Sequence, residues 1–155
     1  MSYWTFSDVF EEQGVINKPF FGGFGLIAID HLPKPSFTAF RLLHNLGDQR
    51  IPEDSNDVLV TKRKDGTLVF AAWNLVEPGA TAPDKSITFT FQGVKGNAAL
   101  SISRVDKTHG DVLTAYDKMA QPAYPSQEQL RQLREVERVA LPQAEHLQTG
   151  APSRW

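Results

Sequence analysis

The first twelve residues combine aromatic rings with carboxylates in a way that could bind a sugar. Flat aromatic faces stack on the C–H face of a sugar ring, and ionised carboxylates accept hydrogen bonds from its hydroxyl groups. A buried strand followed by a solvated loop would use the same residue types, and composition alone favours that plainer interpretation. The aromatic residues are Tyr3, Trp4, Phe6 and Phe10, and the acidic residues are Asp8, Glu11 and Glu12.

The order of motifs along the chain adds weight to the sugar-binding interpretation. The aromatic and acidic run at 3–12 is followed by a glycine-rich motif at 22–26 and by a Pro-Lys-Pro-Ser-Phe motif that opens the stretch 33–40. Two further motifs lie at 116–119 and 122–130. Together these motifs resemble glycoside hydrolase family 39, the family of β-xylosidases and α-L-iduronidase. The resemblance covers most of the chain and is weakest at 48–85 and after residue 141.

The resemblance implies a retaining glycosidase built on a (β/α)8 barrel, whose active site lies at the C-terminal ends of the strands. The opening segment would be the last barrel strand and its loop, so the chain looks like the C-terminal part of a longer enzyme. We therefore expect a mainly β fold with helices: residues 1–47 form the closing βα unit of the barrel, and residues 48–155 form an antiparallel β-sandwich with a C-terminal helix and a loose tail.

The catalytic carboxylates of the family are expected to be absent from this chain. Family members carry an acid/base in an Asn-Glu-Pro motif and a nucleophilic Glu on the penultimate strand, and neither position is present here. A retaining mechanism also needs two carboxyl groups about 5–5.5 Å apart across the bond. Glu11 and Glu12 are sequence neighbours, whose side chains point to opposite faces of an extended chain. No catalytic residue is assigned, and the isolated chain is expected to be inactive.

The resemblance implies a substrate-binding role for three residues. Trp4 would wall the pocket of the terminal xylose, and Glu12, with Glu11 as the less favoured candidate, would bind sugar hydroxyls. Asp8 is expected to be structural, because a short acidic side chain before a turn bonds local amides. A uronate substrate would require a basic residue at the pocket. Lys18 is the nearest one in sequence, so a neutral pentose is favoured.

Hydrophobic periodicity and turn residues predict the remaining elements. A helix is expected to begin near Ser36 and to end at Gly47, and a capping box at Ser126 and Gln129 marks the start of a second helix. The Asp65-Gly66 pair predicts a hairpin turn beside the basic run at 62–64. The predicted strands are 24–29, 58–61, 67–75, 86–91 and 98–105, and the predicted helices are 36–46 and 127–140. Residues 111–119 are predicted to be a short helix or a turn, and 143–155 is predicted to be loose.

Composition limits the partners and compartments to be considered. With 155 residues, a net charge of −2 and no cysteine, neither nucleic acid nor a membrane is an expected partner, and no disulfide or thiolate site is available. The four histidines are scattered, so no metal and no cofactor are proposed. Cytoplasm is the default location, although export of a longer parent would also fit.

Two other classes of function stay open for this sequence. The chain could be a non-catalytic carbohydrate-binding module that uses exposed aromatic residues such as Trp73 or Tyr124, although burial is favoured for Trp73. It could also be a structural module that forms homo-oligomers through exposed sheet edges.

Overall fold

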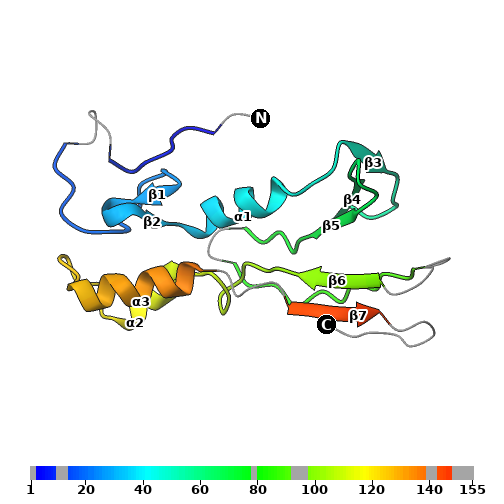
Figure 1. Ribbon diagram of the computed structural model, residues 1–155. Coiled ribbons are helices and arrows are strands. Elements are labelled where there is room, and N and C mark those ends of the chain that lie inside the picture. Colours follow the sequence, from blue (N-terminus) through cyan, green and yellow to red (C-terminus); the bar gives the residue numbers. More distant parts are fainter. Residues whose placement is uncertain (1–2, 10–13, 78–79, 92–97, 139–142, 148–155) are drawn as a thin grey trace. The chain divides into compact units, whose positions relative to one another are not determined.

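The computed structural model describes residues 3–9, 14–77, 80–91, 98–138 and 143–147, with the backbone alone at 137 and 143–147 (Figure 1). These ranges contain three α-helices and seven short strands, and the pairs β1–β2, β3–β4 and β4–β5 are antiparallel. None of the described helices is long and apolar enough to cross a membrane. The elements in chain order are β1 (Ile27–Ala28), the 3-10 helix η2 (Ile29–His31), β2 (Leu32–Pro33), α1 (Pro35–Leu43), β3 (Gln49–Ile51), β4 (Val58–Lys62), β5 (Leu68–Ala72), β6 (Ala98–Ile102), α2 (Val112–Lys118), α3 (Gln127–Glu137) and β7 (Gln143–Leu147).

The chain divides into two compact units. Unit 1 contains Met1–Leu42 and Ser101–Ala144, and unit 2 contains Leu43–Leu100 and Glu145–Trp155. Helices α2 and α3, which the sequence analysis grouped with the sandwich, therefore belong to the same unit as the N-terminal residues. The assignment of 1–47 to a barrel and of 48–155 to a sandwich domain stays a prediction.

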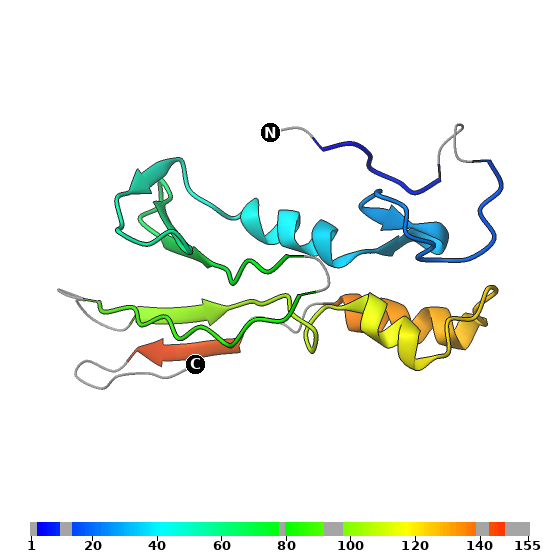
Figure 2. The same cartoon turned by 180° about the vertical axis from the view of Figure 1, so that it is seen from behind.

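The core of unit 1 lies between two helices and the strand pair β1–β2. Helices α2 and α3 run side by side, in yellow and orange in Figures 1 and 2, and α3 also contacts β2. The ring of Phe20 meets Tyr116 edge-on at 5.1 Å, and the Tyr116 hydroxyl donates to the Pro122 carbonyl at 2.7 Å. The buried residues of this core are Ala28, Leu32, Val112, Tyr116, Leu130 and Leu133.

The two predicted helices are confirmed, with ends that differ by a few residues, and the segment left open between a helix and a turn is the helix α2. Asp111 caps α2 by accepting hydrogen bonds from the backbone N–H groups of Leu113 and Thr114. The capping box predicted at Ser126 and Gln129 is present at the start of α3. Both caps satisfy donors that would otherwise have no partner in the first helical turn.

Removal of the α3 cap gives a moderate and specific prediction. Because the Ser126 hydroxyl accepts the Gln129 backbone N–H at 3.2 Å, Ser126→Ala should lower the free energy of unfolding by about 1 kcal/mol. Urea denaturation would measure the change. Ser126→Asp keeps a side-chain acceptor at the N-cap and should stay close to the wild type; equal losses in both variants would show that the cap does not stabilise the helix.

Unit 2 contains a three-stranded antiparallel sheet in the order β3-β4-β5. The predicted hairpin is confirmed: the Arg63 N–H donates to the Thr67 carbonyl at 2.9 Å, and Gly66 supplies the positive φ of +89° that the turn requires. The guanidinium of Arg63 donates to the backbone carbonyl of Asn45. The basic run at 62–64 is therefore part of a hairpin end, as the sequence indicated.

Four sequence predictions need correction within the described residues. The strand predicted at 24–29 is reduced to β1, because residues 24–26 are not in a strand and Ile29 begins the 3-10 helix η2. No strand is assigned at 86–91, although burial alternates as predicted and Phe89 and Phe91 both pack edge-on against Phe70, at 5.0 and 5.4 Å. The segment has the expected faces but lacks ladder hydrogen bonds to a partner strand. Residues 143–147 form β7 beside β6 rather than a loose tail, while 148–155 lies outside the described residues. Trp73, expected to be buried, is 41% exposed.

Candidate functional site

The described part of the N-terminal run, residues 3–9, is called here the rim segment. Its backbone lies alongside Leu26 and Ile27: the Asp8 N–H donates to the Ile27 carbonyl at 2.8 Å, and the Ile27 N–H donates to the Phe6 carbonyl at 3.0 Å. Ser7 and Ile27 form a parallel bridge. Backbone hydrogen bonds to Leu26 and Ile27 thus hold the rim segment over residues 5–8, while its chain bends at Trp4, Phe6 and Asp8.

The aromatic side chains of the rim segment differ in their surroundings. Trp4 is 72% exposed. The Tyr3 hydroxyl donates to the Phe24 carbonyl at 2.9 Å, and its ring meets Phe40 of α1 at 5.4 Å. The ring of Phe6 meets that of Phe37, also in α1, at 6.4 Å, so the helix supports the segment from one side. Of the predicted substrate-binding residues, Trp4 is therefore available to solvent, whereas Glu11 and Glu12 lie outside the described residues.

Asp8 has the structural role that the sequence indicated, but with different partners. Its side chain is fully buried, and its Oδ1 accepts hydrogen bonds from the Gly25 N–H at 2.7 Å and from Lys34 Nζ at 2.8 Å. Oδ2 accepts no well-directed hydrogen bond, yet it lies 2.7 Å from the same ammonium nitrogen and is therefore ion-paired. The expected partners were local amides, whereas the observed ones are 17 and 26 residues away. Such a carboxylate is not free to act on a substrate.

The glycine-rich motif allows the rim segment to approach closely. A Cβ atom at Gly25 would overlap the backbone of Ser7 and Asp8, and one at Gly23 would lie 2.6 Å from Asp8 Oδ1. Only residues without a side chain fit at these two places. The glycine-rich motif therefore allows a close backbone approach to the rim segment around Asp8.

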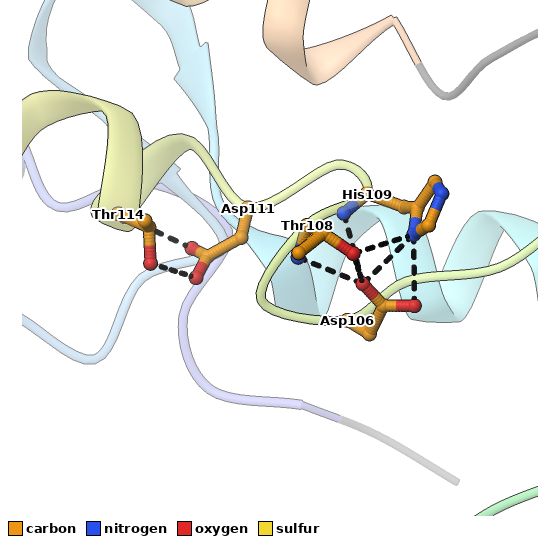
Figure 3. Close-up of polar contacts among 5 residues, drawn as sticks. All are labelled: Asp106, Thr108, His109, Asp111 and Thr114. Atoms are coloured by element: carbon orange, nitrogen blue, oxygen red, sulfur yellow. Dashed lines mark hydrogen bonds and ion pairs between the residues drawn. The ribbon is translucent and has the colours of Figure 1, made fainter.

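A second polar cluster, which the sequence analysis did not single out, lies in the loop before α2 (Figure 3). Asp106 accepts hydrogen bonds from the backbone N–H groups of Thr108 and His109, and its carboxylate lies 2.8 Å from His109 Nδ1. The Thr108 hydroxyl is 2.9 Å from that same ring nitrogen. A catalytic triad needs the acid and the nucleophile at opposite ring nitrogens. The cluster therefore closes a turn, and the Asp-x-Thr-His order is the signal that would have revealed it.

The Asp106 turn gives a pH prediction. Burial would raise the pKa of Asp106, but hydrogen bonds from Thr108 and His109 outweigh it and lower this pKa from 3.8 to about 2. The carboxylate therefore contributes stability above pH 3.8 that is lost as the pH falls through about 2. Titration of the carboxyl carbon by NMR should show the low midpoint, and Asp106→Asn should flatten the fall in Tm between pH 4 and 2. A midpoint at or above 3.8 would contradict the hydrogen-bonded turn.

Two surface hollows lie away from Trp4. One, in unit 2, has a volume of about 370 Å³ and lies between Gly47 and the hairpin end at 63–65. The other, in unit 1, has a volume of about 520 Å³ and lies between α2 and α3. In the ranges that the structure describes, no group of three or more acidic, His or Cys side chains is placed to hold a metal ion.

Comparison with known proteins decides the family. The model of glycosyl hydrolases family 39 matches residues 1–150. This chain is a member of that family. Two β-xylosidases match 85% of the chain: the protein of Geobacillus stearothermophilus is 36% identical over 132 residues, and that of Caldicellulosiruptor saccharolyticus is 32% identical over 139 residues.

Solved family 39 structures share the fold of the chain. A β-xylosidase from Caulobacter crescentus covers 97% of the chain with a TM-score of 0.77 and 28% identity. A family 39 enzyme from Xanthomonas axonopodis pv. citri covers 98% with a TM-score of 0.81 and 26% identity. The chain spans 26% and 28% of the two matched β-xylosidases and 33% of each of these two structures. The family 39 resemblance is thus confirmed.

Proposed function

We propose that the chain is the C-terminal portion of a retaining β-xylosidase that removes terminal xylose from xylo-oligosaccharides. It contributes part of the substrate-pocket rim and the antiparallel sheets, and it lacks the catalytic carboxylate pair. Residues 1–47 are assigned to the closing βα unit of the barrel and 48–155 to the accessory β-sandwich. The observation that carries the proposal is the family 39 match over residues 1–150, with β-xylosidases among the matched proteins.

The chemistry of the rim segment supports a binding role without a catalytic one. Trp4 is 72% exposed beside a backbone that is fixed in register, so its ring can stack on a sugar. Glu12, and less favourably Glu11, would accept hydrogen bonds from sugar hydroxyls. A hydrogen bond to a charged group contributes about 1.5–3 kcal/mol, which orients a sugar but does not cleave it. The two acids that break the glycosidic bond would be supplied by residues preceding this segment.

The coding sequence upstream of Met1 tests the proposal. An in-frame continuation that encodes an Asn-Glu-Pro motif and a later nucleophilic Glu would support it. In that longer product, Trp4→Ala should raise KM for an aryl xyloside about tenfold with a smaller effect on kcat, because stacking binds the ground state as well as the transition state. An upstream stop codon with a ribosome-binding site directly before Met1 would oppose the proposal.

A carbohydrate-binding module is the second candidate, and exposed aromatic residues favour it. Trp73 is 41% exposed and Tyr124 is 84% exposed, so each could stack on a sugar. A xylo-oligosaccharide titration followed by tryptophan fluorescence separates the two candidates. A free-standing module should give a saturable change that Trp73→Ala removes, whereas an incomplete pocket wall should give none.

Self-association through sheet edges is a related proposal for the same chain. Strands β3 and β5 are the edges of the sheet in unit 2, and an unpaired edge can bind another strand. One related structure points the other way, since it is that of a monomeric β-xylosidase from Caulobacter crescentus CB15, with a TM-score of 0.76 and 25% identity to the chain. Sedimentation at several concentrations should show a larger species as concentration rises, and a strict monomer would count against edge pairing.

A further inference from the structure

We propose that the buried Asp8–Lys34 ion pair positions the rim segment that carries Trp4, which makes Lys34 a positioning residue for sugar recognition. That the ligand is a sugar rests on the proposed function. The positioning itself rests on the geometry of unit 1 and can be tested without a sugar.

One ammonium group joins three stretches of chain. Lys34 Nζ lies 2.8 and 2.7 Å from the two carboxylate oxygens of Asp8 and also donates to the Gly23 carbonyl. Asp8 Oδ1 in turn accepts the Gly25 N–H at 2.7 Å. The side chain of Asp8 is fully buried and that of Lys34 is 11% exposed. We call this group of Asp8, Lys34, Gly23 and Gly25 the charged anchor.

The charged anchor sets the register of the rim segment. Asp8 lies at the end of the stretch whose backbone pairs with Leu26 and Ile27. Its ion pair with Lys34 therefore holds the segment in one register with those two residues. Because Gly23 and Gly25 have no side chains, the segment can lie close to them in this register. A shift by one residue would turn the Asp8 carboxylate away from Lys34 and would leave two buried charges unpaired, which is strongly unfavourable.

The position of Trp4 follows from this register. Trp4 is 72% exposed and belongs to the segment that the charged anchor holds, so a displacement of that segment carries the ring with it. The Tyr3 hydroxyl bond to Phe24 holds one side, and the charged anchor holds the other, four residues along the chain. Loss of the anchor should therefore move the Trp4 ring while the helices of unit 1 stay folded.

The anchor also bears on the class of sugar. Both charges of the pair are matched within it, so Lys34 offers no free cation to a carboxylated sugar beside the rim segment. A neutral pentose requires no such cation. The anchor is thus consistent with a pocket wall for an uncharged sugar.

The test uses the whole chain with Trp73→Phe and Trp155→Phe, so that Trp4 is the single tryptophan. In this background, Lys34→Met is compared with Val112→Ala, which alters the unit 1 core away from the anchor. NMR records the Trp4 indole N–H resonance, and hydrogen exchange records the Leu26 and Ile27 amides. Lys34→Met should shift or broaden the indole resonance and raise exchange at these amides at least tenfold relative to the amides of α3. Val112→Ala should leave the indole resonance in place.

A folded Lys34→Met variant with an unchanged Trp4 resonance and unchanged exchange would overturn the proposal. If Lys34→Met does not fold, the double variant Asp8→Asn/Lys34→Met decides, because it removes both charges and leaves none unpaired in the interior. It should still displace the Trp4 resonance, and a wild-type spectrum from it would equally overturn the proposal. Because no readout involves a sugar, failure here is distinct from failure of the proposed β-xylosidase function.

Discussion

Replacing Lys34 with methionine is expected to lower the free energy of unfolding of unit 1 by about 3–5 kcal/mol. The variant keeps most of the side-chain volume but leaves the Asp8 carboxylate without its counter-ion, and Asp8 is fully buried. The penalty is that of an uncompensated charge inside the protein rather than of a lost surface contact. Urea denaturation, followed by amide signals of unit 1, would measure it.

Lys64→Met is the matched control for this prediction. Lys64 lies 4.0 Å from Asp48, and its side chain is 91% exposed. Ion pairs of this kind contribute little to stability, so the change should stay within about 0.5 kcal/mol. Similar losses for the two variants would contradict the claim that burial makes the Asp8–Lys34 pair different.

Leu133→Ala should have an effect of similar size, about 2–5 kcal/mol. Leu133 is fully buried in the core between α2, α3 and the β1–β2 pair. Truncation removes apolar contacts and leaves a cavity that the surrounding helices only partly fill. The lost stability would appear as a lower urea midpoint with little change in slope.

Val136→Ala on the same helix provides the comparison for Leu133. Val136 is 37% exposed, so its truncation should cost less than about 1 kcal/mol. If both substitutions had equal effects, the side of α3 that carries Leu133 would not be the one packed into the unit 1 core.

Features determined by neighbouring residues were predictable from the sequence. The capping box at Ser126, the hairpin at Asp65-Gly66 and the helix after Pro35 each depend on short-range hydrogen bonds or fixed backbone angles. The alternation at 86–91 predicted which side chains would be the less exposed ones, because side-chain direction in an extended chain is local. It did not predict the missing ladder, since pairing needs a partner from elsewhere in the sequence.

Features that depend on distant residues were not predictable in the same way. Lys34 is 26 residues from Asp8, and nothing in the spacing of the two indicates a buried pair. The sequence alone indicates Lys18 as the nearest base and local amides as the partners of Asp8. The recognition of family 39 came from the order of motifs and was confirmed, whereas the sugar-binding roles of Trp4, Glu11 and Glu12 stay predictions.

Hydrolysis of a chromogenic β-xyloside by the pure 155-residue chain tests the central claim most directly. Under the proposed function the rate should equal the blank, because this chain would contribute a wall of the pocket and other residues of a longer enzyme would supply the two carboxylic acids. Trp4→Ala should leave that rate unchanged. Sustained turnover by the wild-type chain, free of any longer protein, would contradict the account.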